Sequence, residues 1–208
     1  MQKIAAVLSA IALTGCSVVG IRSGTEEPKF EVVGAVGSVE VRQYGPRIAA
    51  ETVIAADEDS ARSAGFRRIA GYIFGGNTTN AKIAMTAPVA QSSEQIAMTA
   101  PVAQSQDASG RWVVRFFMPA SYTMASLPTP NDPTVRLVEV PGETMAVLRF
   151  SGFGSVSAMD DQRAELVRAL KGSKWTPSGV PVAWYYDPPW TLPFLRRNEV
   201  AVPVTEAD

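Results

Sequence analysis

The residue types that most often perform chemistry are nearly missing from this chain. It contains no histidine, and its only cysteine is Cys16. Histidine is the commonest general base, a frequent zinc ligand and the usual proximal haem ligand, so none of these roles can be filled in the ordinary way. A Ser–His–Asp triad, a Cys–His pair and an intrachain disulfide are excluded as well.

Carboxylates are present but are not arranged for catalysis. Asp57-Glu58-Asp59 and Asp160-Asp161 lie where helices are expected to begin, and negative charge is favourable there because of the helix dipole. The sequence contains no G-x-S-x-G, zinc-binding or phosphate-loop motif. We therefore expect a protein that is not an enzyme and has neither catalytic residues nor a metal site.

Large apolar and aromatic side chains are concentrated in the predicted strands, and most of them are expected to form the core. As a set they could also line a groove for a flat apolar ring system such as a tetrapyrrole, with polar groups at its rim. The candidate pocket residues are Met85, Met98, Phe116, Met118, Trp184, Tyr186, Trp190, Arg196 and Arg197.

Arg196 and Arg197 follow a stiff, proline-rich segment. Guanidinium groups pair with carboxylates, so these two side chains could meet the propionates of a porphyrin. They could equally pair with Glu199 or hold the end of a strand, which would be a structural role.

The N-terminus has the pattern of a bacterial lipoprotein signal. A positive start is followed by an apolar run of ten residues, 4–13, interrupted only by Ser9, which is too short to span a bilayer but suits a signal peptide. The run ends in Leu13-Thr14-Gly15-Cys16, which resembles the lipoprotein cleavage box. We expect residues 1–15 to be removed, Cys16 to carry lipid, and residues 16–29 to form a flexible tether. Ser17 in place of Asp favours anchoring to the outer membrane, with the domain facing the periplasm.

Composition supports one well-packed domain. The chain has 208 residues, of which 46% are hydrophobic and 19% charged, and its net charge is −1. Nucleic-acid binding needs a positive stripe, so it is not expected. The membrane contact is expected through the acylated N-terminus, and the protein is expected to be a monomer.

One phrase occurs twice. Residues 83–92 read I-A-M-T-A-P-V-A-Q-S, and residues 96–105 repeat them letter for letter. Proline cannot donate to a sheet ladder, so Pro88 and Pro101 should lie at strand ends or on an edge. The two copies could pair as an edge hairpin with residues 91–95 as its turn.

The rest of the chain has the same order of elements twice. Strands are expected at 39–44, 47–54 and 112–118, and again at 134–140, 144–150, 182–186 and 199–204, with the first two closing a hairpin. A helix with Phe66, Ile69, Ala70 and Ile73 on one face follows the first pair of strands. A helix capped by Ser157 follows the second pair. Each half, about 30–118 and 134–204, is too small to bury its own apolar face, so the two should pack together into a barrel-like core.

Two motifs resemble a known family. Lys82 to Val89, K-I-A-M-T-A-P-V, is similar to the K-I-x-M-T-x-P-V signature of the SOUL haem-binding proteins, and residues 186–200 resemble that family's closing segment. The resemblance covers roughly residues 30–204. It implies an α+β fold, in which a distorted antiparallel β-barrel of two pseudo-symmetric ββαββ halves is flanked by two helices, as in effector-binding domains.

The same resemblance implies weak binding of haem or another tetrapyrrole in an apolar cleft, here without a histidine ligand. The alternative is an envelope module that binds another hydrophobic small molecule or a protein partner, and no haem.

Overall fold

The computed structural model describes residues 25–93, 111–188 and 190–207. The predicted signal peptide, Cys16, Met98 and the second copy of the repeated phrase lie outside these residues. The described chain is α+β, as expected. Its elements are β1 (Phe30–Val36), β2 (Val39–Tyr44), β3 (Arg47–Ala55), α2 (Glu58–Ile73), β4 (Val89–Ser93), β5 (Arg111–Phe117), β6 (Val135–Val140), β7 (Glu143–Phe150), α3 (Val156–Leu170), β8 (Trp175–Pro177), β9 (Val182–Tyr185), the 3-10 turn η1 (Pro193–Leu195) and β10 (Asn198–Glu206).

The strands form one antiparallel sheet in the order β1-β2-β7-β10-β9-β4-β5-β3-β6, and β8 adds to β10. The order β2-β7-β10-β9 returns in reverse as β4-β5-β3-β6, so the two halves are related by a pseudo-two-fold axis between β4 and β9. The first strand of each half pairs across to the other half, because β2 lies beside β7 and β6 lies beside β3. The halves are therefore interlocked.

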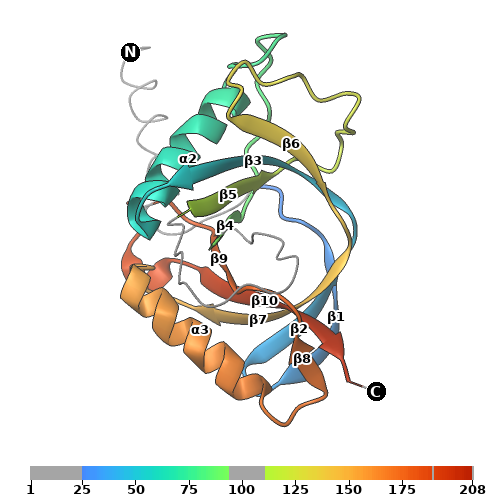
Figure 1. Ribbon diagram of the computed structural model, residues 1–208, viewed down its shortest axis with the longest axis vertical. Helices are drawn as coiled ribbons and strands as arrows, with labels where there is room; N and C mark the ends of the chain where they lie inside the picture. The colour runs from blue at the N-terminus through green and yellow to red at the C-terminus, as the bar shows by residue number, and fades with distance from the viewer. Residues whose placement is uncertain (1–24, 94–110, 189, 208) are drawn as a thin grey trace, which may run out of the picture.

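The strand pairing corrects two predictions. The strands at 39–44 and 47–54 do not form a hairpin, because β2 pairs with β1 and β7 while β3 pairs with β5 and β6. The sheet is also strongly curved but open, with β1 and β6 at opposite ends of the pairing order, so it is not a closed barrel (Figure 1).

The first copy of the repeated phrase does not lie at an edge of the sheet, and its predicted pairing with the second copy falls outside the described residues. The first copy runs into β4, which is central and pairs with β5 on one side and β9 on the other. Both edges of residues 89–91 are thus paired within the sheet. Pro88 immediately precedes the strand, as its missing N–H predicts.

Helix α2 begins where the sequence places it. The Asp57 side chain caps it by accepting a hydrogen bond from the Ser60 N–H at 2.9 Å, and Ile69, Ala70 and Ile73 are buried while Phe66 is partly exposed.

Helix α3 starts two residues earlier than predicted. Ser155 rather than Ser157 is its cap, because the Ser155 hydroxyl accepts from the Ala158 N–H. Met159, Leu166 and Leu170 form its buried stripe.

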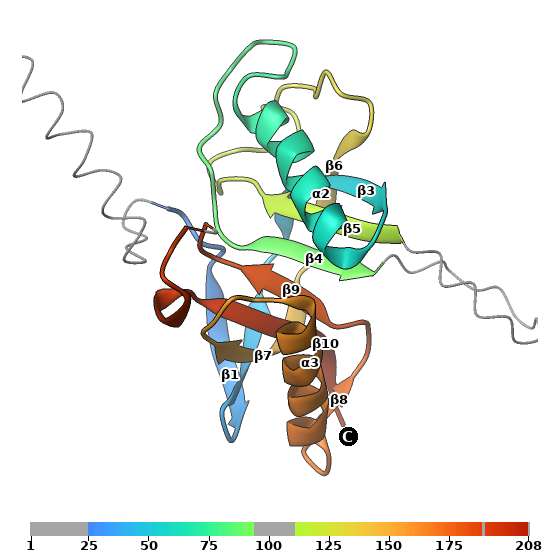
Figure 2. The ribbon, with the colours of Figure 1, turned by 90° about the vertical axis from the view of Figure 1, so that its left-hand side faces the viewer.

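Both helices cover the same face of the sheet, which we call the outer face (Figure 2). Helix α2 packs on β3 and β5, and α3 packs on β7 and β10. Because side chains alternate along a strand, a second set points to the opposite, inner face. That set forms its own apolar cluster, which includes Tyr44, Phe117, Met145, Trp184 and Ala201.

The N-terminal segment differs from the predicted flexible tether over residues 25–29. Glu26 forms a parallel bridge with Thr86, and the Glu27 carboxylate pairs with Arg197 at 3.0 Å. The folded domain therefore begins before Phe30. Among the described residues, no helix has the length and apolar character needed to cross a bilayer.

Candidate ligand-binding cavity

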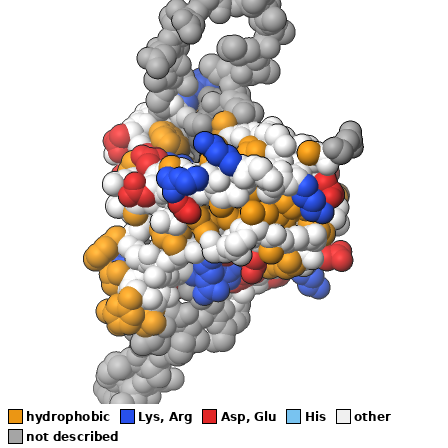
Figure 3. All heavy atoms as spheres, turned by 90° about the horizontal axis from the view of Figure 1, so that it is seen from below, with side chains coloured by type: hydrophobic (Ala, Val, Ile, Leu, Met, Phe, Trp, Pro, Cys, Tyr) orange, Lys and Arg blue, Asp and Glu red, His pale blue; other side chains and the backbone are white. Residues whose placement is uncertain are grey.

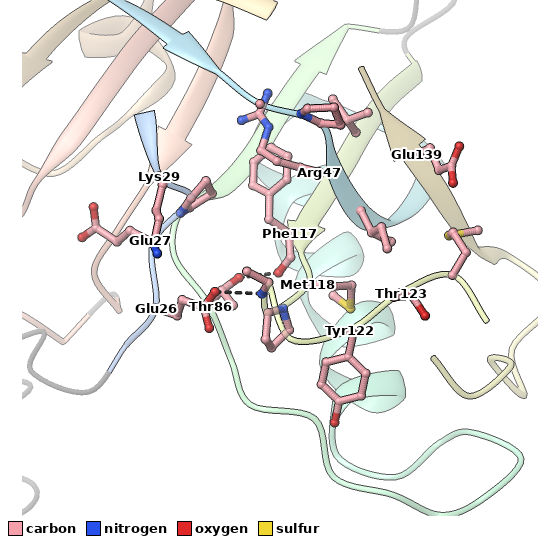
Figure 4. Close-up of a pocket in the computed structure, with 18 of the residues that line it drawn as sticks. Glu26, Glu27, Lys29, Arg47, Thr86, Phe117, Met118, Tyr122, Thr123 and Glu139 are labelled. Atoms are coloured by element: carbon pink, nitrogen blue, oxygen red, sulfur yellow. Dashed lines mark hydrogen bonds between the residues drawn. The ribbon is translucent and has the colours of Figure 1, made fainter. Parts of the chain in front are cut away.

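A cavity of about 800 Å³ lies at one end of the inner face, and we call it the N-terminal cavity (Figure 4). Its volume falls in the range of about 300–1,000 Å³ that small-molecule sites occupy. Four stretches that are distant in sequence form its walls: residues 26–29, 45–48, 117–124 and 139–141.

Hydrogen bonds hold the N-terminal segment against the loop after β5. The Ala87 N–H donates to the Glu26 carbonyl at 3.0 Å, and the Ala120 N–H donates to the Glu26 carboxylate at 2.8 Å. The hydroxyl of Thr86, which is buried, donates to the Phe117 carbonyl. One wall of the cavity is thus fixed by the segment that the sequence alone assigns to a tether.

The lining combines apolar side chains with a polar rim. Phe117, Met118, Tyr122 and Met124 contribute aromatic rings, thioethers and a phenol, and Figure 4 shows Met118 and Tyr122 side by side in the lower wall. The charged lining residues are Glu26, Glu27, Lys29, Arg47 and Glu139. Thioether and phenolate are both known axial ligands of haem iron, and the cations are suited to carboxylates.

Arg47 is the most unusual of these residues. Its guanidinium lies between the rings of Tyr44 and Phe117, with 4.5 Å from its central carbon to each ring centroid, and it pairs with Glu143. Nε and Nη1 are buried and find no acceptor among the described residues. Burial lowers the pKa of Arg47, because the charged form is poorly solvated there.

A buried ionic network adjoins the apolar cluster of the inner face. Glu199 is fully buried and accepts from Arg42 at 2.9 and 3.3 Å, from Arg197 at 2.9 Å and from the Tyr186 hydroxyl at 2.7 Å. Burial opposes ionisation of Glu199, but the bonds and charge of the two arginines prevail and lower its pKa. Burial, followed by the charge of Glu199, raises the pKa of Tyr186, which therefore stays protonated. Arg42 belongs to β2 and Glu199 to β10, and Arg197 also pairs with Glu27, so the network joins these strands to the N-terminal segment.

A second hollow, the inner-face groove, has a volume of about 460 Å³ and lies toward the other end of the strands. Its lining includes Trp184, Met145 and the buried carboxylate of Glu51, which pairs with Arg115 at 2.6 Å and Arg136 at 2.8 Å. Phe117 lines both hollows, so the apolar cluster of the inner face, to which it belongs, lies between them.

The structure does not bring the sequence-predicted pocket residues into one cavity. Of those that the structure describes, Met118 alone is on the wall of the N-terminal cavity. Phe116 is buried on the outer face in the cluster beneath α2. Trp184 and Tyr186 belong to the inner-face cluster, and Met85 is partly exposed.

The residues predicted near the C-terminus have separate roles. Trp190 is exposed, and Arg196 donates to the carbonyl of Thr191 at 2.7 Å. Arg197 pairs with Glu199 and Glu27 and covers the Tyr186 ring at 3.8 Å, which is the structural role that its sequence neighbours allowed.

Tyr122, Met124 and Arg47 are cavity residues that sequence reasoning missed. Tyr122 and Met124 lie in the proline-rich stretch 119–133, which has no periodic pattern to show which side chains face inward. An arginine opening an apolar strand, as in Arg47-Ile48-Ala49-Ala50, was the available signal for a buried cation.

The described residues contain no group of three or more acidic or cysteine side chains arranged to hold a metal ion. Basic and acidic side chains alternate over the face drawn in Figure 3, and no basic stripe is visible on it.

Solved structures with this fold are distant in sequence. The C-terminal domain of EcmrR is 12% identical and aligns with a TM-score of 0.56, covering 81% of this chain and 98% of that one. A hydrolase from Listeria innocua is 12% identical with a TM-score of 0.52, covering 83% and 94%. At this identity the likeness shows the fold alone.

Sequence relatives identify the family. "Heme-binding protein 2" of Mus musculus is 28% identical over 193 residues, which is 87% of this chain and 89% of that protein. The Homo sapiens protein of the same name is 30% identical over 167 residues, covering 79% and 77%. The family described as "SOUL heme-binding protein" matches residues 25–203. The chain belongs to the SOUL heme-binding protein family.

Proposed function

We propose that this protein binds haem or another tetrapyrrole in the N-terminal cavity, without a histidine ligand and without catalysing a reaction. The observation that carries the proposal is the family match over residues 25–203 together with a cavity of ligand size on the inner face. Family membership supports the ligand class, and the cavity supports the place.

The lining suits such a ligand. Met118, Tyr122 and Met124 would contact the apolar macrocycle. Lys29 and Arg47 would receive its carboxylates. A bound haem would supply the redox and gas-binding chemistry of its iron, while the protein supplies the enclosure.

The test is a titration of the full chain with three probes: haemin, iron-free protoporphyrin and a hydrophobic cation. Because no histidine is available to hold the iron, we expect similar affinities for the two porphyrins and weak overall binding. The variant Met124→Glu places a carboxylate on the cavity lining and should weaken porphyrin binding at least about tenfold, which is about 1.4 kcal/mol. Val167→Glu makes the same change at a similarly exposed apolar residue on α3 and should leave binding unchanged.

Other results would redirect the proposal. Binding of the cation alone would favour the alternative of a module for other hydrophobic molecules, and no binding of any probe would favour a protein partner. Equal porphyrin binding by Met124→Glu and the unaltered chain would keep the function but remove it from this cavity.

We also propose that the mature protein is a monomeric lipoprotein held in the outer membrane by acylated Cys16, with its domain in the periplasm. The support is the sequence alone: an apolar run of residues 4–13 followed by Leu-Thr-Gly-Cys. Metabolic labelling with a radioactive fatty acid should mark the unaltered protein, and Cys16→Ser should abolish the label and release the protein from membranes.

A further inference from the structure

Two neighbouring loops present large apolar side chains to solvent. The loop between β7 and α3 carries Phe153, which is 74% exposed, and the loop between β9 and β10 carries Trp190 at 62% and Phe194 at 70%. Leu192 and Leu195 in the second loop are also exposed. Together these five residues form what we call the aromatic patch. Exposed apolar groups that gather in one place mark an interaction surface, whereas single ones need no explanation.

The patch is held in place. The Gly152 N–H donates to the Pro193 carbonyl at 2.9 Å, which ties the two loops together. Arg196 donates to the Phe153 carbonyl at 3.4 Å, and its guanidinium lies 5.5 Å from the centre of the Phe153 ring. The apolar side chains are therefore presented by a braced pair of loops.

The chain enters the domain beside this patch. Arg197, at the end of the second loop, pairs with Glu27, which is two residues from the first described residue, Thr25. In Figure 2 the red loop between β9 and β10, which carries η1, passes beside the blue N-terminal segment. A chain leading from Cys16 thus reaches the fold at the edge of the patch.

The available length keeps the patch near the anchor. Residues 17–25 can span at most roughly 30 Å when fully extended, and about 15–18 Å as a flexible coil. A compact domain of this size has a radius of gyration of about 16 Å. Attachment over so short a distance gives the adjacent surface an effective concentration at the membrane in the millimolar range, so even weak contacts are sustained.

We propose that the aromatic patch docks on the lipid surface in which Cys16 is anchored and so fixes the orientation of the domain. Tryptophan favours the interfacial layer of a bilayer, phenylalanine and leucine enter its apolar boundary, and arginine keeps its charge at the headgroups. Arg196 and Arg197 are offset by Glu27 and Asp187 close by, so the contact is apolar in character and insensitive to salt. The inference rests on the proposed lipid anchor.

The test uses the full lipidated chain in phosphatidylcholine vesicles that contain lipids spin-labelled near the headgroup. Trp175 and Trp184 are buried and Trp112 in β5 is half-buried, so the exposed Trp190 should give most of the quenching, and Trp190→Phe identifies its share. We expect quenching of Trp190 that is unchanged at raised salt. It should be mostly lost in Phe153→Ser/Phe194→Ser and retained in Phe74→Ser, a similarly exposed phenylalanine at the end of α2.

The outcomes separate the patch from the anchor. If the chain floats with vesicles while Trp190 stays unquenched, the patch proposal is overturned and the anchor stands; the patch would then serve another partner. If the chain does not float, the anchor fails, and the same chain is titrated with vesicles in excess. A quenched Trp190 then upholds the patch by itself, and an unquenched one overturns it too.

Discussion

Replacing Glu199 by glutamine should strongly destabilise the fold. The carboxylate is fully buried and receives hydrogen bonds from Arg42, Arg197 and the Tyr186 hydroxyl. An amide of the same shape removes the negative charge and turns an NH₂ group toward guanidinium donors. The guanidinium of Arg42, whose side chain is only 4% exposed, would then lose its main buried counter-charge and keep only the Glu40 carboxylate at the surface.

The expected loss is about 3–5 kcal/mol, because breaking a buried ion pair from one side leaves an uncompensated charge in the interior. Urea denaturation followed by far-UV circular dichroism measures it. With a urea m-value of about 2 kcal/mol per molar, the unfolding midpoint should fall by roughly 1.5–2.5 M.

The loss should also depend on pH. The pKa of Glu199 in the folded protein is lowered below its unfolded value, so the carboxylate stabilises the fold fully above the unfolded pKa. This stabilisation disappears as the pH falls through the folded pKa. The difference in unfolding free energy between the unaltered chain and Glu199→Gln should therefore be constant near neutrality and shrink in acid.

The control is Glu165→Gln, which breaks the exposed pair with Arg168 on α3 and should cost less than about 1 kcal/mol. If Glu199→Gln costs no more than this control at an unchanged m-value, the reasoning about a buried, uncompensated arginine is refuted. A loss that grows in acid would contradict the sign of the pKa shift.

Two further predictions concern helix packing and capping. An added Cβ at Gly65 would lie 2.5 Å from a methyl of Val114, so Gly65→Ala should push α2 away from β5. Urea denaturation should show a loss of about 1–3 kcal/mol in unfolding free energy. In the control Gly71→Ala the added Cβ meets nothing within 4 Å, so the unfolding free energy should stay the same or rise by up to about 1 kcal/mol. Ser155→Ala should lower the unfolding free energy by about 1 kcal/mol through loss of the α3 cap, and Ser157→Ala should change it little; the reverse order would restore Ser157 as the cap.

Local patterns predicted the elements well. The alternation of Val39 and Val41 and the acidic start of α2 each depend on neighbours in sequence, and the structure confirms the element that each indicated. The apolar spacing of Met159, Leu166, Val167 and Leu170 likewise predicted α3, although Val167 is exposed while the other three are buried. The α+β class with two helices followed from these elements, because each helix needs one apolar sheet face on which to pack.

The pairing of strands was less predictable. Gly45-Pro46 between two strands has the composition of a hairpin turn, yet the chain uses it to cross from one half of the sheet to the other. Nothing in the local sequence distinguishes the two uses, since the choice is made by burial of both halves together. The central position of β4 was missed for the same reason, because an exact repeat nearby suggested a local partner.

The family was predicted from the sequence, whereas the walls of the cavity were not. The two motifs indicated the family, and the family model confirms it over residues 25–203. The cavity walls, however, come from four separated stretches, and Tyr122 and Met124 belong to a loop whose side-chain directions follow no period. Phe116 and Phe117 illustrate the limit: adjacent strand residues face opposite sides of the sheet, and only Phe117 reaches the cavity.

The cavity and the interlocking of the halves are consequences of one topological feature. Each half sends its first strand to the other half, so the chain must cross twice, at the turn after β2 and at the turn after β6. The crossings meet: a Cβ added at Gly142 would lie 3.0 Å from the Tyr44 carbonyl oxygen and 3.6 Å from Pro46. Pro46 and Pro141, one from each crossing, also line the N-terminal cavity. Two separate bodies, each with its own interior, would have neither the shared inner face nor the junction at which this cavity forms.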